Sequence, residues 1–248
     1  MAGHSHWAGI KHKKARVDAK RGKIFSKLAK RIIQTARNGS DPEYNFVLRR
    51  AIEKAQSYNM PKDKIENAVM KGAGQLGDSR LEEIVYEGYN SDGIAIMVEA
   101  LTENTNRTTP EIRHTFEKRG GSLGSPGSVA WKFTPQGLFL VRDEEMEEEE
   151  FIDIMIDAGI EDYSKTDSTY ELYTSAEAFA EVKTILEQKG FEFSAEITKV
   201  PKTPIEIDKS QYERVLPLME ELEDHDDVQD VYADFDVPDD VVAEVDKN

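Results

Sequence analysis

The chain has 248 residues, no cysteine and a formal net charge of −17. This length allows up to three small domains with their own cores, and the lack of cysteine excludes disulfides, thiolate nucleophiles and cysteine-based zinc sites. No apolar run approaches the roughly 18 residues of a membrane span, and residues 1–7 contain no hydrophobic signal core, so we expect a cytoplasmic protein with no membrane partner. A mitochondrial transit peptide over residues 1–40 is the alternative, but the segment is rich in lysine and poor in serine.

The charge is unevenly divided along the chain. Residues 1–80 hold 18 Lys and Arg against 7 Asp and Glu, whereas residues 81–248 hold 14 against 42. Like charges gathered in one segment repel one another, so the basic segment indicates an anionic partner, and nucleic acid is the first candidate. The acidic remainder should repel a polyanion, so we expect it to face away from the ligand and the interface to be confined to the N-terminal module. Whether the acidic part folds back onto the basic arm when no ligand is bound stays open at this point.

The first 80 residues predict an arm followed by three helices. Residues 1–17 hold too few apolar side chains to fold alone. Apolar residues recur with a helical period from about Asp18 to Arg37, where Asn38-Gly39 follows as a stop. Asp41-Pro42 predicts the start of a second helix, and Met60-Pro61 that of a third, which ends at Gly72. The expected core stripe of the second helix is Val47, Leu48, Ala51, Ile52 and Ala55.

After residue 80 the pattern becomes α+β. Strands over 84–89 and 94–101, a helix from Thr109-Pro110 to Lys118 and a strand over 129–133 come first. The next elements have the ferredoxin-like order βαββαβ, with strands at 137–142, 162–165, 169–174 and 191–200 and helices at 146–158 and 176–188. An extended segment at 204–207, a helix at 209–222 and a strand at 228–235 could complete the first sheet.

The predicted fold class is therefore α+β: an N-terminal three-helix domain followed by two α+β, ferredoxin-like domains, one inserted in the other. The expected boundaries are 1–80 for the basic helical domain, 81–133 plus 204–240 for the discontinuous domain, and 134–203 for the inserted domain.

The arm and the first helix hold the candidate nucleic-acid contacts. Residues 1–37 contain eleven basic residues and one acidic residue, whereas a merely soluble helix face mixes both signs. Ammonium and guanidinium groups neutralise phosphates and release counterions, and an aromatic ring can stack on a base. The candidates are Trp7, Lys11, His12, Lys13, Lys14, Arg16, Lys20, Arg21, Lys23, Lys27, Lys30, Arg31 and Arg37. Gln34 and Arg37 could also read base edges, but lysine dominates and suits backbone contact.

The other motifs do not specify chemistry. His4, His6 and His12 lack the further ligands of a metal site, so we expect extra phosphate donors and no metal or cofactor. The glycines of 72–77 follow a helix rather than a strand, which argues against a dinucleotide fingerprint. Those of 120–128 could form an anion-binding nest or simply tight turns. The acidic run at 143–150 suits a helix N-terminus. No nucleophile elbow or triad spacing is present, so we predict no enzyme and no small-molecule substrate.

Several motifs in register resemble the YebC-type family. They are Met1-Ala-Gly-His-Ser-His-Trp7, Ile10-Lys-His-Lys-Lys14, Asp18-Ala-Lys-Arg-Gly-Lys23, Asp41-Pro42, Asn59-Met-Pro61, Tyr86-Glu-Gly-Tyr89, Asn106-Arg-Thr108, Gly120-Gly-Ser-Leu-Gly124 and Gly127-Ser-Val129. His6 and Ser40 depart from the family pattern. The resemblance covers about residues 1–240. It implies a helical domain plus two α+β domains, one inserted in the other, and no enzymatic activity.

The resemblance also implies a function. Bacterial members are described as cytoplasmic DNA-binding transcriptional regulators, and mitochondrial relatives are translational activators of cytochrome c oxidase subunit I. We therefore expect a non-enzymatic DNA-binding regulator of transcription. The alternative is a translation factor that binds ribosomal or messenger RNA and the ribosome, and a protein assembly factor is a further alternative.

Overall fold

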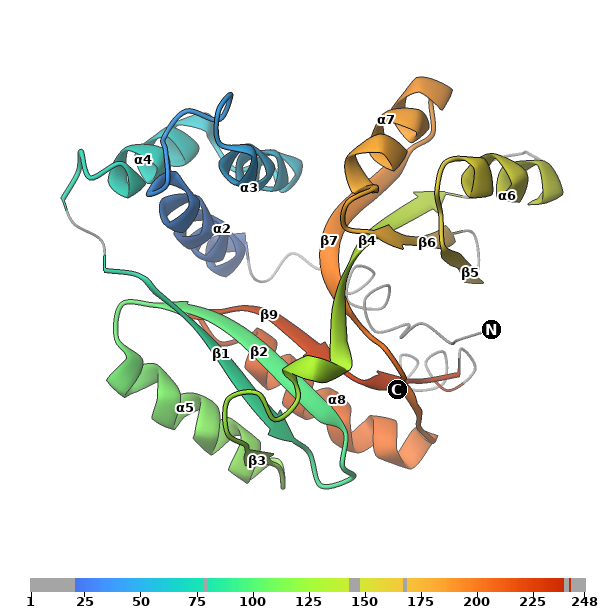
Figure 1. Ribbon diagram of the computed structural model, residues 1–248. Coiled ribbons are helices and arrows are strands. Elements are labelled where there is room, and N and C mark those ends of the chain that lie inside the picture. Colours follow the sequence, from blue (N-terminus) through green and yellow to red (C-terminus); the bar gives the residue numbers. More distant parts are fainter. Residues whose placement is uncertain (1–20, 78–79, 143–147, 167–168, 239–240, 242–248) are drawn as a thin grey trace. The chain divides into compact units, whose positions relative to one another are not determined.

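The computed structural model describes residues 21–77, 80–142, 148–166, 169–238 and 241 (Figure 1). These residues form two compact units. One contains the described residues between 17 and 128 together with 214–231, and the other contains 129–213 and the described residues from 232 onward. The helical bundle and the first sheet thus share a unit, and the domain boundaries given above remain predictions.

Three helices form the bundle: α2 (Arg21–Ala36), α3 (Phe46–Ser57) and α4 (Lys62–Gly72). Their facing sides bury Leu28, Ile32, Ile33, Leu48, Ala51, Ala55, Ile65 and Ala68. Gly72 lies where α4 closely approaches α2, since a Cβ atom there would stand 2.5 Å from the carbonyl oxygen of Ile33. The predicted helix end at Gly72 is therefore also a packing position.

The predicted start of the second helix was wrong. The carbonyl of Asp41 accepts the N–H groups of Tyr44 and Asn45 in a turn, and α3 begins after Asn45, whose side chain accepts the N–H of Leu48 at 3.0 Å. Val47 is 61% exposed and so does not belong to the core stripe. It lies about 100° around the helix from Leu48, outside the buried arc.

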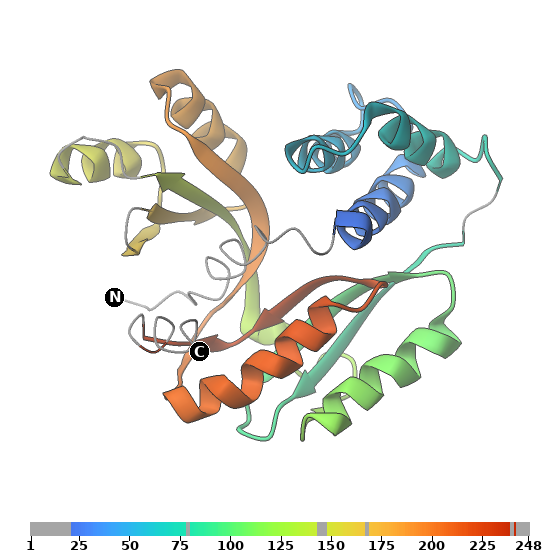
Figure 2. The ribbon, with the colours of Figure 1, turned by 180° about the vertical axis from the view of Figure 1, so that it is seen from behind.

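The first sheet has the strand order β3-β1-β2-β9. Its strands are β1 (Glu82–Tyr89), β2 (Ala95–Thr102), β3 (Ser122–Leu123) and β9 (Val228–Ala233), and helices α5 (Thr105–Lys118) and α8 (Lys209–Glu223) lie against one face (Figures 1 and 2). The expected helix start at Thr109-Pro110 was wrong, because Asn104 caps α5 one turn earlier by accepting the N–H of Arg107. Pro110 therefore lies inside α5, where it has no N–H to donate to the preceding turn.

The second sheet has the order β5-β6-β4-β7, which is the ferredoxin-like arrangement. Its strands are β4 (Phe133–Arg142), β5 (Asp162–Thr166), β6 (Thr169–Ser175) and β7 (Phe193–Pro201), and α6 (Glu148–Asp157) and α7 (Phe179–Lys189) cover one face (Figure 1). The core between them contains Phe139, Val141, Phe151, Met155, Tyr170, Leu172, Val182 and Leu186. The predicted α+β class is confirmed.

Two predicted strands differ in detail. The expected strand at 129–133 is a 3-10 turn, η2 (Ala130–Lys132), because the N–H of Lys132 bonds to the carbonyl of Val129 at 2.9 Å. The expected strand at 228–235 divides into β9 and β10 (Phe235–Asp236), which pairs in parallel with β8 (Ile205–Glu206). The break falls at Asp234, whose carbonyl accepts the N–H of Ile205 and whose carboxylate binds Lys132.

Candidate nucleic-acid interface

The described part of the predicted interface is the polar side of α2. Trp7, Lys11, His12, Lys13, Lys14, Arg16 and Lys20 lie outside the described residues, as does the side chain of Arg21. Lys23, Lys27, Lys30 and Arg31 lie along one side of α2, within an arc of about 100°, and we call them the cationic row. It is bonded to residues 223–230, which comprise the last residue of α8, the turn after it and the start of β9, and which we call the acidic segment.

The cationic row is bonded to the acidic segment along its whole length. Lys23 donates to a carboxylate oxygen of Asp224 at 3.1 Å, and its ammonium nitrogen lies 3.7 Å from a carboxylate oxygen of Asp226. The hydrogen bond to Asp224 raises the pKa of Lys23. Lys27 donates to the carbonyl of Glu223. This end of the row therefore binds the carboxylates of Asp224 and Asp226 and the main-chain carbonyl of Glu223 at the end of α8.

The other end of the row reaches the sheet. Lys30 donates to the carboxylate of Asp227 at 2.6 Å and to the carbonyl of Asp226 at 2.9 Å. The guanidinium of Arg31 lies among three carboxylates, 3.4 Å from Asp230, 3.5 Å from Glu83 and 3.7 Å from Glu99. The side chains of Lys30 and Arg31 are only 20% and 30% exposed, so these pairs are less screened by solvent than ordinary surface pairs.

Asp227 is the buried centre of this contact. Its side chain is 2% exposed, and besides Lys30 it accepts from Thr108 at 2.7 Å, Thr102 at 3.1 Å and the guanidinium of Arg107. Burial alone would raise the pKa of this carboxyl, but the hydrogen bonds from Lys30, Thr108 and Arg107 outweigh burial and hold the pKa well below its usual range. Asp227 therefore stays ionised and joins α2, α5 and β2.

The sequence left open whether the acidic part of the chain folds back onto the basic segment, and in this structure the acidic segment binds the basic helix α2. Asp224, Asp226, Asp227 and Asp230 neutralise the cationic row within the folded chain. The row and the acidic segment lie about 200 positions apart in sequence, so no local pattern reveals the pairing. The one available signal was charge: a basic helix face and an acidic loop at the end of a helix attract each other.

The two proposed base readers are also bonded within the chain. Arg37 donates to the carbonyl of Leu81 at 2.7 Å and to the side-chain oxygen of Gln34 at 3.2 Å. Arg37 thereby ties the end of α2 to the residue that precedes β1.

The glycine-rich loop at 120–128 holds an anion that belongs to the chain itself. The N–H of Gly127 donates to the carboxylate of Glu87 at 2.6 Å, and the N–H of Gly124 donates to the carbonyl of Glu87 at 2.7 Å. Gly127 has a φ of +85°, a conformation that glycine adopts without strain. Of the two interpretations left open above, the structural one explains these contacts.

The hydrogen bonds of His225 lie within the unit that contains the first sheet. His225 accepts the N–H of Asp227 through Nδ1 at 3.1 Å, and its Nε2 lies 3.0 Å from Glu111. Within the described ranges, no three His, Asp or Glu side chains come together as a metal site would require. In the same part of the chain, no helix combines the length and apolarity that a bilayer crossing requires.

The fold, together with the binding of α2 to the acidic segment, defines an α+β protein. It has a basic N-terminal bundle, a discontinuous sheet and an inserted ferredoxin-like sheet. The family model described as the TACO1/YebC protein N-terminal domain matches residues 5–75, and the model of the TACO1/YebC second and third domain matches residues 81–235. The chain therefore belongs to the TACO1/YebC family, and the resemblance found in the sequence is confirmed.

Relatives cover nearly the whole chain. A protein from Dictyoglomus turgidum named "Probable transcriptional regulatory protein" is 51% identical over 98% of both chains. One of the same description from Thermoanaerobacter pseudethanolicus is 48% identical over 96% of this chain and 98% of its own. The crystal structure of a conserved hypothetical protein, Aq1575 from Aquifex aeolicus, is 46% identical, covers 95% of this chain and 98% of its own, and superposes with a TM-score of 0.83.

Proposed function

We propose that this protein is a cytoplasmic, non-enzymatic regulator of transcription that binds DNA through cationic residues of its N-terminal segment. The observation that carries the proposal is the ratio of eleven basic residues to one acidic residue over positions 1–37. Such a concentration of one sign supplies sequence-independent affinity for a phosphate backbone. The description shared by the relatives from Dictyoglomus and Thermoanaerobacter supports regulation of transcription as the setting.

Within that segment the proposed contacts fall into two groups. Trp7, Lys11, His12, Lys13, Lys14, Arg16, Lys20 and Arg21 form the primary group, which would contact phosphates and, through Trp7, stack on a base or sugar. The cationic row forms the second group, because its ammonium and guanidinium groups already bind the acidic segment. The row can contact phosphate only when it leaves those carboxylates. DNA and the acidic segment therefore compete for it.

A specific observation favours a second candidate, a translation factor that binds structured RNA on the ribosome. Gln34 on α2 and Arg37 just after it are the possible base readers. Arg37 donates to the side-chain oxygen of Gln34 and to the main-chain carbonyl of Leu81. Sequence-specific DNA readers present such side chains to base edges, whereas shape-led recognition of structured RNA depends on phosphate and sugar contacts.

Crosslinking in growing cells, followed by sequencing of the bound DNA and RNA, tests both candidates. The matched proteins are the wild-type chain and two triple variants. One carries Lys11→Gln, Lys13→Gln and Lys14→Gln, and the control carries Lys62→Gln, Lys189→Gln and Lys202→Gln. We expect recovery of nucleic acid to fall in the first variant alone. Predominant DNA supports regulation of transcription, and predominant ribosomal RNA replaces it with the second candidate. Equal recovery from all three proteins contradicts nucleic-acid binding by the N-terminal segment.

A further inference from the structure

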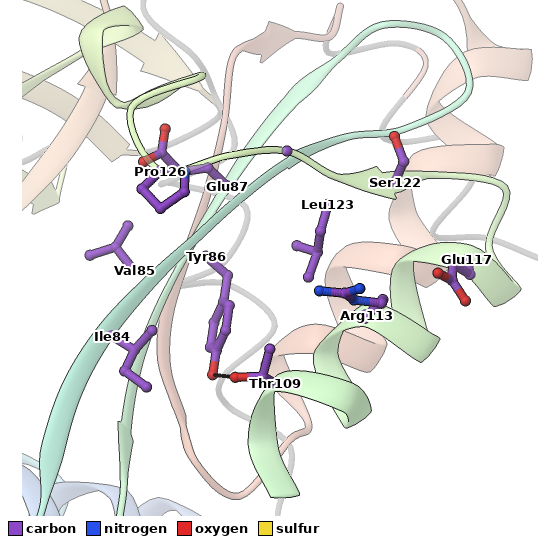
Figure 3. Close-up of a pocket in the computed structure, with 11 residues that line it drawn as sticks. Ile84, Val85, Tyr86, Glu87, Thr109, Arg113, Glu117, Ser122, Leu123 and Pro126 are labelled. Carbon is purple, nitrogen blue, oxygen red and sulfur yellow. Dashed lines mark hydrogen bonds between the residues drawn. The ribbon is translucent and has the colours of Figure 1, made fainter. Parts of the chain in front are cut away.

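A cleft of about 350 Å³ lies beside the outer edge of β1. Its walls are the strand edge around Val85, the side of α5 that carries Thr109 and Arg113, and the chain segment 122–126 (Figure 3). The cleft lies wholly within the unit that contains the helical bundle and the first sheet. None of the functional assignments above uses it.

The register of β1 leaves main-chain groups free at this edge. Alternate residues of an antiparallel pair exchange hydrogen bonds. The N–H of Asn90 donates to the carbonyl of Ile94 at the hairpin end, so Gly88, Tyr86 and Ile84 are the β1 residues that bond to β2. The residues between them must direct their N–H and C=O groups to the other edge.

Glu87 confirms this direction, because its carbonyl accepts the N–H of Gly124 on the outer side. β3 pairs with β1 only at Gly88 and Tyr89. The N–H and C=O groups of Val85 and Glu83 therefore point outward from the sheet and find no strand partner among the described residues. A free strand edge of this kind is a template for another extended chain.

The walls of the cleft combine apolar surface with one cation. Ile84, Leu123 and Pro126 supply aliphatic surface, and Tyr86 closes the floor with a hydrogen bond between its hydroxyl and that of Thr109 at 2.9 Å (Figure 3). Arg113 lies one helical turn after Thr109, beside Leu123 (Figure 3). Within the described part of the chain, the guanidinium group of Arg113 forms no hydrogen bond or ion pair.

We propose that this cleft binds an extended peptide segment of a partner protein, which adds as a strand to the outer edge of β1 and places one carboxylate against Arg113. The main chain of the peptide would bond to the N–H and C=O groups of Val85. Its alternate side chains would enter the apolar part of the cleft, since side chains of a strand alternate between faces. A groove between an edge strand and a helix suits this mode of recognition.

Charge selects this occupant over two others. Glu87 and Glu117 line the cleft together with Arg113, so a nucleic acid with a phosphate on every residue would be repelled, whereas a peptide needs only one carboxylate. A second copy of the chain, paired antiparallel about Val85, would place Glu83 opposite Glu87 of its mate. Like charges directly opposite each other destabilise a strand pair.

The test begins with a phage-displayed library of random linear octapeptides, selected on the full-length protein. We expect enriched sequences with alternating apolar residues and one Asp or Glu. The binding of an enriched synthetic peptide, measured by fluorescence anisotropy, should fall at least about tenfold in Val85→Pro, because an edge strand tolerates proline but loses the outward N–H. Binding should fall similarly in Arg113→Glu and be largely retained in Arg113→Lys. Arg49→Glu, which changes an exposed arginine on α3, is the control.

Hydrogen exchange on the wild-type protein gives a second readout that needs no variant. The peptide should slow exchange of the Val85 amide while leaving that of Tyr86 unchanged, because Tyr86 already bonds to β2. Failure to enrich an alternating sequence overturns the proposal, as does undiminished binding to both Val85→Pro and Arg113→Glu. Protection of Val85 by an octauridine strand instead of a peptide also overturns it. DNA binding by the N-terminal segment should be unaffected by Val85→Pro, so the two proposals can fail separately.

Discussion

Replacing Asp227 by asparagine removes the buried charge that joins α2 to the first sheet. Lys30, Arg107, Thr102 and Thr108 all donate to this carboxylate. Asparagine has nearly the same shape, but it accepts through one oxygen only, and its amide group would face hydrogen-bond donors. The variant thus keeps the packing and changes the electrostatics.

The expected cost follows from the contacts. A hydrogen bond to a charged group contributes about 1.5–3 kcal/mol to stability, and a neutral one contributes about 0.5–1.5 kcal/mol. Asp227→Asn weakens two charged hydrogen bonds and places its amide against one donor, so we expect the free energy of unfolding to fall by about 3 kcal/mol. This lies at the low end of the range for a broken buried pair, because the side chains of Lys30 and Arg107 retain 20% and 53% exposure and can reach water.

The dependence on pH has a definite sign. The pKa of Asp227 is lowered in the folded chain, so its contribution is fully present above the unfolded pKa of about 3.9 and is lost as the pH falls toward the folded pKa. The difference in stability between wild type and Asp227→Asn should therefore be constant above about pH 5 and should shrink below about pH 4.

Urea unfolding followed by circular dichroism at pH 7 and pH 3 measures both effects. The matched control is Asp226→Asn, because that neighbouring side chain is 72% exposed and its nearest cation lies 3.7 Å away. The control substitution should lower the free energy of unfolding by less than about 0.5 kcal/mol. If Asp227→Asn cost no more than Asp226→Asn, or if its cost were the same at pH 3 and pH 7, the assignment of Asp227 as the ionised centre of the contact would be refuted.

Two further predictions concern the bundle. The double variant Asp224→Asn and Asp230→Asn should bind duplex DNA several times more tightly at low salt, because it releases part of the cationic row. An unchanged gel-shift midpoint would show that the acidic segment does not compete with DNA. Gly72→Ala should lower the melting temperature, since its Cβ would meet the Ile33 carbonyl at 2.5 Å, whereas Gly22→Ala, also helical and with no described atom within 4 Å, should not. Equal melting temperatures for the two glycine variants would contradict the close approach of α4 to α2.

The sequence predicted those features that depend on neighbouring residues. Helical periods gave α2 and α4, and the alternation of strand and helix patterns gave the ferredoxin-like order of the second sheet. The start of α3 was missed because Asp41 and Asn45 are both good N-cap residues. Asn45 caps α3 because its side-chain amide also donates to the carbonyls of Thr35 and Gly39.

The features that the sequence did not predict depend on distant residues. The contact between the cationic row and the acidic segment requires that β9 pair with β2, which brings Asp227 against Thr102 and Thr108. The cleft beside β1 arises because β3 is only two residues long. Neither the pairing partner nor the length of an edge strand can be read from a local pattern.

The dependence of DNA affinity on salt tests the central claim most directly. Binding of a 30-base-pair duplex is measured from about 50 to 200 mM salt for wild type and for the triple variant Lys11→Gln, Lys13→Gln and Lys14→Gln. If these lysines contact phosphates, the slope of log affinity against log salt should fall in magnitude by about 2–3, since each contact contributes about 0.9. An unchanged slope and affinity in the variant would contradict the account.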